Sequence, residues 1–437
     1  MKTKVVAIFV SLLVFSALTG CSNNNAQKTE MGLDKQAEDV VTVKVLYPWG
    51  EDAFKQRYEA IDQKLEHIKL ELIPAEATSE SLQELNAKNM TPDLIHSNLG
   101  LAPLEGLDMI QPLDDLIEQY NFDLDSFLPS VVETIRSADS EGRILGLPTN
   151  GRTYALFYNK DIFDLFGVPY PEGQLTWTEV LDLSKKMNGE RNGQQYRGLE
   201  LGQANTGNDT LTPLLELGVN LTDPETGEVL ITQEPAVTKY FELMEHLYSI
   251  PGLYNPDPEA REAYEFPLST VGMLVSWVDY PRWGIPEADF MDHVGVLPVP
   301  VWEDKGAAPI PMGTARLVIN KHSEQKEAAF EVISEYLSAE HQSMLAAKYS
   351  EVPVLKDEKV LTKFGSESEK LKNLELAPVF SIDYTSPPEN VSRWDEYVDI
   401  QGSLAEFAKF EADIPTFLRT LEEKSNPKIQ EAMSQME

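Results

Sequence analysis

The feature that most constrains the fold is an alternation of short strands and helices in residues 40–120. Residues 40–46 form a β-branched run of alternating polarity, which is typical of a strand. Helices and strands are then expected in turn, with a helix at 53–65, a strand at 67–73, a helix at 82–89, a strand at 92–96 and a helix at 113–120. This order predicts an α/β layer with largely parallel strands. Such sheets bind ligands at the carboxyl ends of their strands, where the loops that hold Trp49 and Asn98 are expected.

Later segments continue the mixture of strands and helices. Asp161 opens a helical pattern that is expected to end at Gly167. Thr176 and Glu179 have the spacing of a capping box, in which the threonine hydroxyl accepts from the glutamate amide and the glutamate side chain returns to the threonine amide. Further strands are expected at 154–158, 271–278, 294–301 and 316–319, and a long amphipathic helix at 325–337.

The N-terminus has the pattern of a bacterial export signal. Lys2 and Lys4 precede an apolar stretch at 5–17, which is too short to span a membrane. The sequence Leu-Thr-Gly that ends the stretch is followed by Cys21, and the whole resembles the lipobox, in which the chain is cut before the cysteine and the thiol is acylated. We therefore expect a signal peptide at 1–20, lipidation of Cys21, a flexible tether at 21–39, and attachment to the extracellular face of the cell membrane.

Size and charge limit the remaining possibilities. The 437 residues, less the signal, are too many for one compact core and suit two domains or one bilobal unit. Cys21 is the single cysteine, so no disulfide is expected within the fold. The chain has 72 acidic residues against 36 Lys and Arg, which argues against nucleic acid or an anionic lipid surface as the partner.

The order of motifs resembles a known family. The motifs that carry this resemblance are Pro-Asp-Leu-Ile at 92–95, Leu-Asp-Asp-Leu at 113–116, the segment 142–148, Tyr-Asn-Lys-Asp-Ile-Phe at 158–163, Thr-Trp-Thr-Glu at 176–179 and the region 298–319. Together they resemble the family 1 extracellular solute-binding proteins of bacterial ABC importers, the group that includes the maltose-binding proteins. The resemblance covers essentially the whole mature chain.

The resemblance implies an α/β, periplasmic-binding-protein-like fold of two lobes, joined by three crossing segments with a ligand cleft between them. Carried over, the crossings fall near 147–151, near Val299 and near 351–353. Lobe 1 would comprise 40–150 plus 299–351, and lobe 2 would comprise 151–298 plus 352–437. The implied function is to capture a carbohydrate, most simply an oligosaccharide, by hinge closure and to deliver it to the permease subunits in the membrane.

Sugars are bound by aromatic faces and by planar polar groups that bridge hydroxyls. Side chains of these types, at loops that the fold would place in the cleft, form the expected substrate-binding set: Trp49, Glu51, Asn98, Arg152, Tyr154, Trp277, Asp279, Trp283 and Arg316. The patch 277–283 is the densest of these groups. Arg152 is included because its position faces ligand in the maltose-binding relatives. A turn role for Asn98 and an interlobe salt bridge for Arg152 stay open as alternatives.

Two tryptophans are uncertain on sequence alone. The family often shows Gly-x-Ala-Met and, about six residues on, Gly-x-Trp, whereas here Trp277 follows the Gly-Met pair more closely and has no glycine before it. The orientation of its indole is therefore left open. Trp177 lies inside the capping box and is expected to be structural, and Trp394 is not assigned a place.

An enzyme is the main alternative class, for example a secreted glycosidase with two carboxylates. The six histidines lack zinc-ligand spacing, and no Gly-x-Ser-x-Gly elbow or phosphate-binding glycine loop is present. We therefore expect no catalysis, no metal and no cofactor. A surface sensor that uses the same fold without transport stays open. Arg152 and Arg316 make an acidic saccharide conceivable, although neutral oligosaccharides are the simpler expectation, with peptides and polyamines more remote.

Overall fold

The computed structural model describes residues 40–254, 263–310 and 315–434, which belong to one compact unit. The expected signal peptide at 1–20, the tether at 21–39 and Cys21 lie outside the described residues. Within the described part, no helix combines the length and apolar character needed to cross a membrane.

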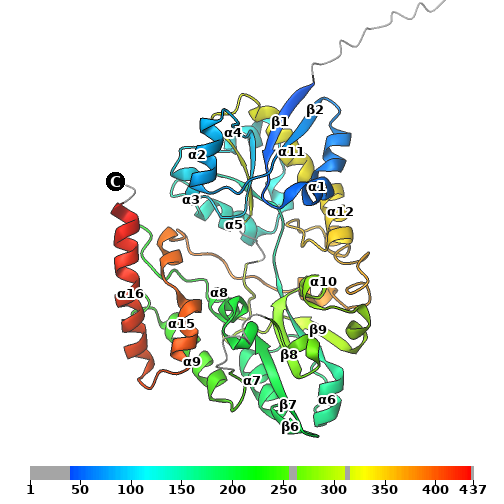
Figure 1. Ribbon diagram of the computed structural model, residues 1–437, viewed down its shortest axis with the longest axis vertical. Coiled ribbons are helices and arrows are strands. Elements are labelled where there is room, and N and C mark those ends of the chain that lie inside the picture. The colour runs from blue at the N-terminus through cyan, green and yellow to red at the C-terminus, as the bar shows by residue number, and fades with distance from the viewer. Residues whose placement is uncertain (1–39, 255–262, 311–314, 435–437) are drawn as a thin grey trace, which may run out of the picture. The chain divides into compact units, whose positions relative to one another are not determined.

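A first sheet has the strand order β2-β1-β3-β10-β4 (Figure 1). Strand β1 (Val41–Leu46) pairs in parallel with β2 (Ile68–Ile73) on one side and β3 (Leu94–Ser97) on the other. These three strands confirm the parallel layer that the sequence predicts. Strand β10 (Arg316–Ile319) is antiparallel to both β3 and β4 (Leu147–Pro148), because the chain enters it from the far sheet.

Helices cover the first sheet with apolar faces. Helix α1 (Gly50–Lys64) begins earlier than the sequence pattern indicates, with Glu51 and Asp52 in its first turn where the helix dipole favours acidic groups. It buries Phe54, Tyr58 and Ile61 in a core shared with the later helix α11. The other helices around this sheet are α2 (Ser79–Ala87), α4 (Asp114–Gln119), α5 (Pro129–Ser137), α11 (Lys326–Tyr336) and α12 (Ala339–Tyr349).

A second sheet has the order β6-β7-β8-β5-β9 and is mixed. The central strand β5 (Tyr154–Asn159) is antiparallel to both neighbours, β8 (Val271–Trp277) and β9 (Val294–Pro298). Outside β8 lie β7 (Gln194–Leu201), which is parallel to it, and the short β6 (Gly189–Arg191). All residues of β8 except its last, Trp277, are buried.

Local signals fix the helices around the second sheet. Helix α6 (Lys160–Phe166) ends at Gly167, whose φ of 66° suits glycine. The capping box at Thr176 is confirmed: it opens α7 (Trp177–Lys186), and the Trp177 indole is buried with its Nε1 donating to Glu216 at 2.8 Å. Trp394 is also buried in this core, together with α9 (Pro235–Ser249), α15 (Ile400–Phe407) and α16 (Ile414–Ser434).

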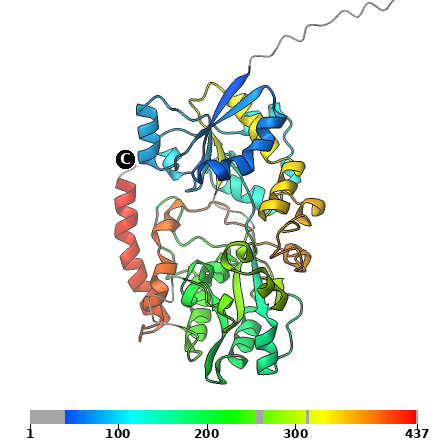
Figure 2. The same cartoon turned by 45° about the vertical axis from the view of Figure 1, so that its right-hand side comes forward.

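Five further α-helices are short; they are α3 (Ala102–Glu105), α8 (Thr212–Leu215), α10 (Tyr280–Gly284), α13 (Glu358–Leu361) and α14 (Ala377–Phe380). Short 3-10 helices, such as that at Leu124–Ser126, also occur in the described chain. Figure 2 gives a second view of the two sheets and the segments that run between them.

Several segments of the chain connect the two sheets. It leaves β4 at Pro148 and enters β5 at Tyr154. In this connection Gly151 forms an antiparallel bridge with Val352, so the first and third expected crossings lie side by side. Strand β9 ends at Pro298, directly before Val299, and both Val299 and Ala308 pack in the core that covers the second sheet.

Candidate ligand-binding site

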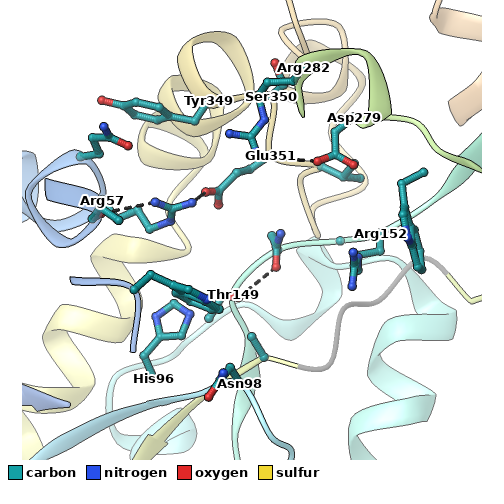
Figure 3. Close-up of a pocket in the computed structure, with 18 of the residues that line it drawn as sticks. Arg57, His96, Asn98, Thr149, Arg152, Asp279, Arg282, Tyr349, Ser350 and Glu351 are labelled. Atoms are coloured by element: carbon teal, nitrogen blue, oxygen red, sulfur yellow. Dashed lines mark hydrogen bonds and ion pairs between the residues drawn. The ribbon is translucent and has the colours of Figure 1, made fainter. Parts of the chain in front are cut away.

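A cavity of about 550 Å³ lies where the connecting segments meet the ends of both sheets. Its wall comes from the start of α1, the end of β3, residues 149–153, the end of β8 with α10, and residues 349–352 after α12. Figure 3 shows Arg57 and His96 on one side of this cavity and Arg152 and Asp279 on the other. Five of the expected binding residues line it: Trp49, Asn98, Arg152, Trp277 and Asp279.

Trp49 stands at the N-terminus of α1 with 49% of its surface exposed. Its ring meets those of Tyr47 and His96 edge-on, at centroid distances of 5.3 Å and 5.0 Å. His96 is buried at the end of β3, where its Nδ1 lies 3.1 Å from the Tyr58 hydroxyl, and burial lowers its pKa to about 3. The imidazole is therefore neutral, and the Trp49 indole is held on a rigid, uncharged support.

Asn98 follows β3 and also lines the cavity. Its side-chain oxygen is buried and accepts no hydrogen bond from the residues that the structure describes. A buried acceptor without a donor costs about 1–3 kcal/mol. The Asn98 amide would therefore gain free energy from a ligand hydroxyl.

Trp277 stacks with two neighbours, and the sequence did not indicate either contact. Tyr154 is its direct partner across the β5–β8 ladder, and the two rings lie 3.9 Å apart at an interplanar angle of 26°. The guanidinium carbon of Arg152 lies 3.8 Å from the indole centroid. Tyr154 itself is 4% exposed and does not line the cavity. Its role here is to support the indole rather than to face the cavity.

Asp279 and Arg282 bring charge to the same side of the cavity. Asp279 caps α10, and its carboxylate lies 3.7 Å from the guanidinium of Arg282 one turn later. Burial raises the pKa of Asp279, while Arg282 and Arg152 act in the opposite direction. Desolvation is the larger effect, so the pKa of this carboxyl group lies above its usual range.

Sequence reasoning missed an ion pair on the opposite side, between Arg57 of α1 and Glu351 after α12. Burial raises the pKa of Glu351, and Arg57 opposes that shift. Arg57 shares one face of α1 with Ala53 and Gln56, which also line the cavity. This i, i+3, i+4 spacing after Trp49 could have indicated from the sequence that Arg57 faces the cavity. No local sequence pattern indicates Glu351, which reaches the cavity only through the tertiary fold.

Three expected residues besides Tyr154 lie elsewhere. Glu51 is on the outer face of α1 and pairs with Lys55 at 2.6 Å. Trp283 is 50% exposed outside the cavity and packs edge-on against Tyr280 at 4.9 Å. Arg316 is at the start of β10, opposite Ser97, and lines a separate hollow together with the side chains of Arg143 and Lys321.

The cavity suits binding better than bond cleavage. Its two carboxylates, Asp279 and Glu351, each have a guanidinium partner, Arg282 and Arg57. Trp49 and Trp277 supply flat apolar surfaces. Indoles, carboxylates and guanidiniums of this kind together match a ligand with apolar C–H faces and many hydroxyls.

Comparisons with known proteins agree with this architecture. The arabinooligosaccharide-binding protein of Halalkalibacterium halodurans is 22% identical over 265 residues, which cover 57% of this chain and 55% of that protein. The chain thus spans about half the length of this relative. The sn-glycerol-3-phosphate-binding periplasmic protein UgpB of Agrobacterium fabrum is 34% identical over 80 residues, or 18% of each chain.

Solved structures show the same fold at low identity. The sugar-binding protein MalE from Xanthomonas citri superposes with a TM-score of 0.71 and 18% identity, over 90% of this chain and 98% of that one. The expected periplasmic-binding-protein-like fold is therefore confirmed. The family model described as bacterial extracellular solute-binding protein matches residues 47–343, more than half of the sequence. The chain belongs to the bacterial extracellular solute-binding protein family.

Proposed function

We propose that this protein is the substrate-binding component of an ABC importer and that it captures a carbohydrate in the cavity described above. The observation that carries the proposal is the position of Trp49 and Trp277, which line one cavity from the two different sheets. Each indole is braced by other aromatic side chains, and guanidiniums and carboxylates stand beside them. The names of the arabinooligosaccharide-binding and sugar-binding relatives support the same ligand class.

The proposed mechanism is a two-state hinge between lobes built on the two sheets. Lobe 1 would hold the first sheet and lobe 2 the second, with the second crossing near Val299, directly after β9. A ligand that contacts both Trp49 and Asp279 binds the closed arrangement better than the open one. It shifts the population by that difference in affinity alone. The closed, loaded protein would then deliver the sugar to the permease subunits.

The proposal includes a lipid anchor at Cys21 and a tether at 21–39, which rest on the sequence pattern alone. Such an anchor would hold the protein at the extracellular face of the membrane, next to its permease. Labelling of cells with a radioactive fatty acid tests this part. Label should appear in the native chain and disappear from a Cys21→Ser variant.

A thermal-shift screen of the purified protein against mono- and oligosaccharides tests the ligand class. A ligand that binds only the folded state raises the melting temperature by mass action, by an amount that grows with its concentration over Kd. The proposal expects at least one saccharide that shifts the melting temperature and is recovered chemically unchanged. A saccharide that is consumed would favour the carbohydrate-active enzyme, and no shift with any saccharide would contradict the carbohydrate assignment.

A further inference from the structure

The charged side chains that line the cavity carry an excess of positive charge, although the chain as a whole has a formal net charge of −36. Guanidiniums reach the cavity from Arg57, Arg152 and Arg282, and carboxylates from Asp279 and Glu351. Three cations face two anions, which leaves one positive charge. A locally positive cavity does not improve the solubility of an acidic protein. The positive charge of the cavity therefore points to a negatively charged ligand.

Two of the three guanidiniums are already matched by carboxylates. Arg57 pairs with Glu351, and both side chains are largely buried, with exposures of 18% and 9%. Arg282 lies 3.7 Å from Asp279, close enough for charge attraction. These two pairs account for both carboxylates of the cavity wall, and the unmatched cation is Arg152.

Arg152 forms no ion pair with any residue in the described part of the chain. Its guanidinium is instead held against Trp277, 3.8 Å from the indole centroid. Two carboxylates attract it electrostatically, that of Asp279, which Arg282 also attracts, and that of Asp209. Asp209 is buried and does not line the cavity; its Oδ2 accepts a hydrogen bond from the Tyr264 hydroxyl at 2.7 Å, and its Oδ1 is buried with no hydrogen-bond partner among the described residues. Asp209 therefore attracts the Arg152 guanidinium without forming an ion pair with it.

A guanidinium that stacks on an indole contacts it through its flat face. Its N–H donors then point outward in the plane of the guanidinium group and stay available to a ligand. Paired N–H donors of this kind bind a carboxylate through two parallel hydrogen bonds. His96, the histidine in the wall, is neutral and adds no charge. The excess of one charge therefore matches a ligand with a single negative charge better than a phosphate dianion.

We infer that the ligand is an acidic saccharide whose carboxylate is bound by Arg152. This inference rests on the proposed carbohydrate-binding function and narrows it to sugars of the uronate class. The same geometry makes Arg152 a specificity-determining residue. It would contribute little to a neutral sugar and much to an acidic one.

The test compares two oligosaccharides that differ only in one group, a uronate and its neutral counterpart with a hydroxymethyl group in place of the carboxylate. Calorimetry measures both affinities for the native protein, for Arg152→Gln and for Arg143→Gln. Arg143 pairs with Asp139 away from the cavity, so its variant removes the same charge without touching the site. Native protein and Arg143→Gln should prefer the uronate at least about tenfold, and Arg152→Gln should lose that preference.

Each other outcome has a separate meaning. Equal or tighter binding of the neutral sugar by the native protein overturns the inference and leaves the carbohydrate-binding function intact. A preference that survives in Arg152→Gln also overturns it. A sugar phosphate that binds more tightly than the uronate would contradict the match to a single negative charge. Failure of every saccharide to bind would instead refute the proposed function itself.

Discussion

Arg57 of helix α1 forms an ion pair with Glu351, in the segment that leaves helix α12. The pair joins the helix that follows Trp49 to residues 350–352, which line the cavity next to Gly151. Both charges are largely removed from water, so each depends on the other for compensation. The cavity wall therefore contains a structural element whose loss should be visible in stability.

Replacement of Arg57 by alanine should lower the free energy of unfolding by about 3–5 kcal/mol, because it leaves the Glu351 carboxylate buried without a partner. Urea denaturation measures this change. The double variant Arg57→Met with Glu351→Gln should be less destabilised than Arg57→Ala, since it removes both charges together. A loss below about 1 kcal/mol in Arg57→Ala would mean that the pair behaves like an exposed one.

Trp277→Ala should weaken saccharide binding by about 2 kcal/mol or more if the indole stacks on a sugar ring. Tyr170→Ala is the control, because Tyr170 is an exposed aromatic residue that does not line the cavity. Titration calorimetry with a saccharide found in the thermal-shift screen measures both. Equal affinities in the two variants would remove Trp277 from the binding site.

On the other side of the cavity, Trp49→Ala should also weaken binding, whereas Glu51→Ala should leave it unchanged. Both residues lie at the start of α1, but Glu51 faces outward and pairs with Lys55. The indole of Trp49 should further report ligand by a change in its fluorescence, because 49% of its surface is exposed. If Glu51→Ala weakened saccharide binding as much as Trp49→Ala, the effect would come from the start of helix α1 and not from a contact between the indole and the ligand.

The buried Glu200 of β7 gives a prediction for pH. Its carboxylate accepts hydrogen bonds from the backbone amides of Glu265 and Phe266, yet burial raises its pKa from 4.5 to about 8. Between these values the folded protein holds a proton that the unfolded chain has released. Glu200 therefore contributes stability that is fully present below pH 4.5 and is lost as the pH rises through about 8.

The matching measurement is the unfolding free energy of the native protein and of Glu200→Gln across this range. The native protein should lose stability relative to the variant as the pH rises, with a limiting slope of about 1.4 kcal/mol per pH unit for one proton. The glutamine keeps an acceptor for one of the two amides. Parallel curves for the two proteins would show that Glu200 does not bind the extra proton.

Much of the fold could be predicted because its signals are local. Alternating polarity located β1 and β2, and the spacing of Thr176 and Glu179 specified a capping box that forms as expected. The antiparallel course of β10 could not be predicted in this way, because it depends on which sheet the chain comes from. The packing of Ala308 in the second core could not be predicted either, because no local pattern in the sequence indicates it.

The candidate site could likewise be predicted only in part from the sequence. Trp277 and Trp283 belong to one patch of sequence, yet one ends a strand and the other lies on the exposed face of a short helix. The composition of this segment identified it as a candidate binding patch. Which of its two indoles lines the cavity depends on the change from strand to helix between them, which the composition does not indicate. Arg57 and Glu351 lie far apart in sequence and meet through tertiary packing, so no motif could have paired them.

The bridge between Gly151 and Val352 has a mechanical consequence. The amide of Gly151 donates to the carbonyl of Val352 at 2.6 Å, so these two connections form a miniature ribbon rather than two independent threads. Sliding of one connection past the other would break this hydrogen bond. Arg152, which directly follows Gly151, would therefore have to move together with the two connections.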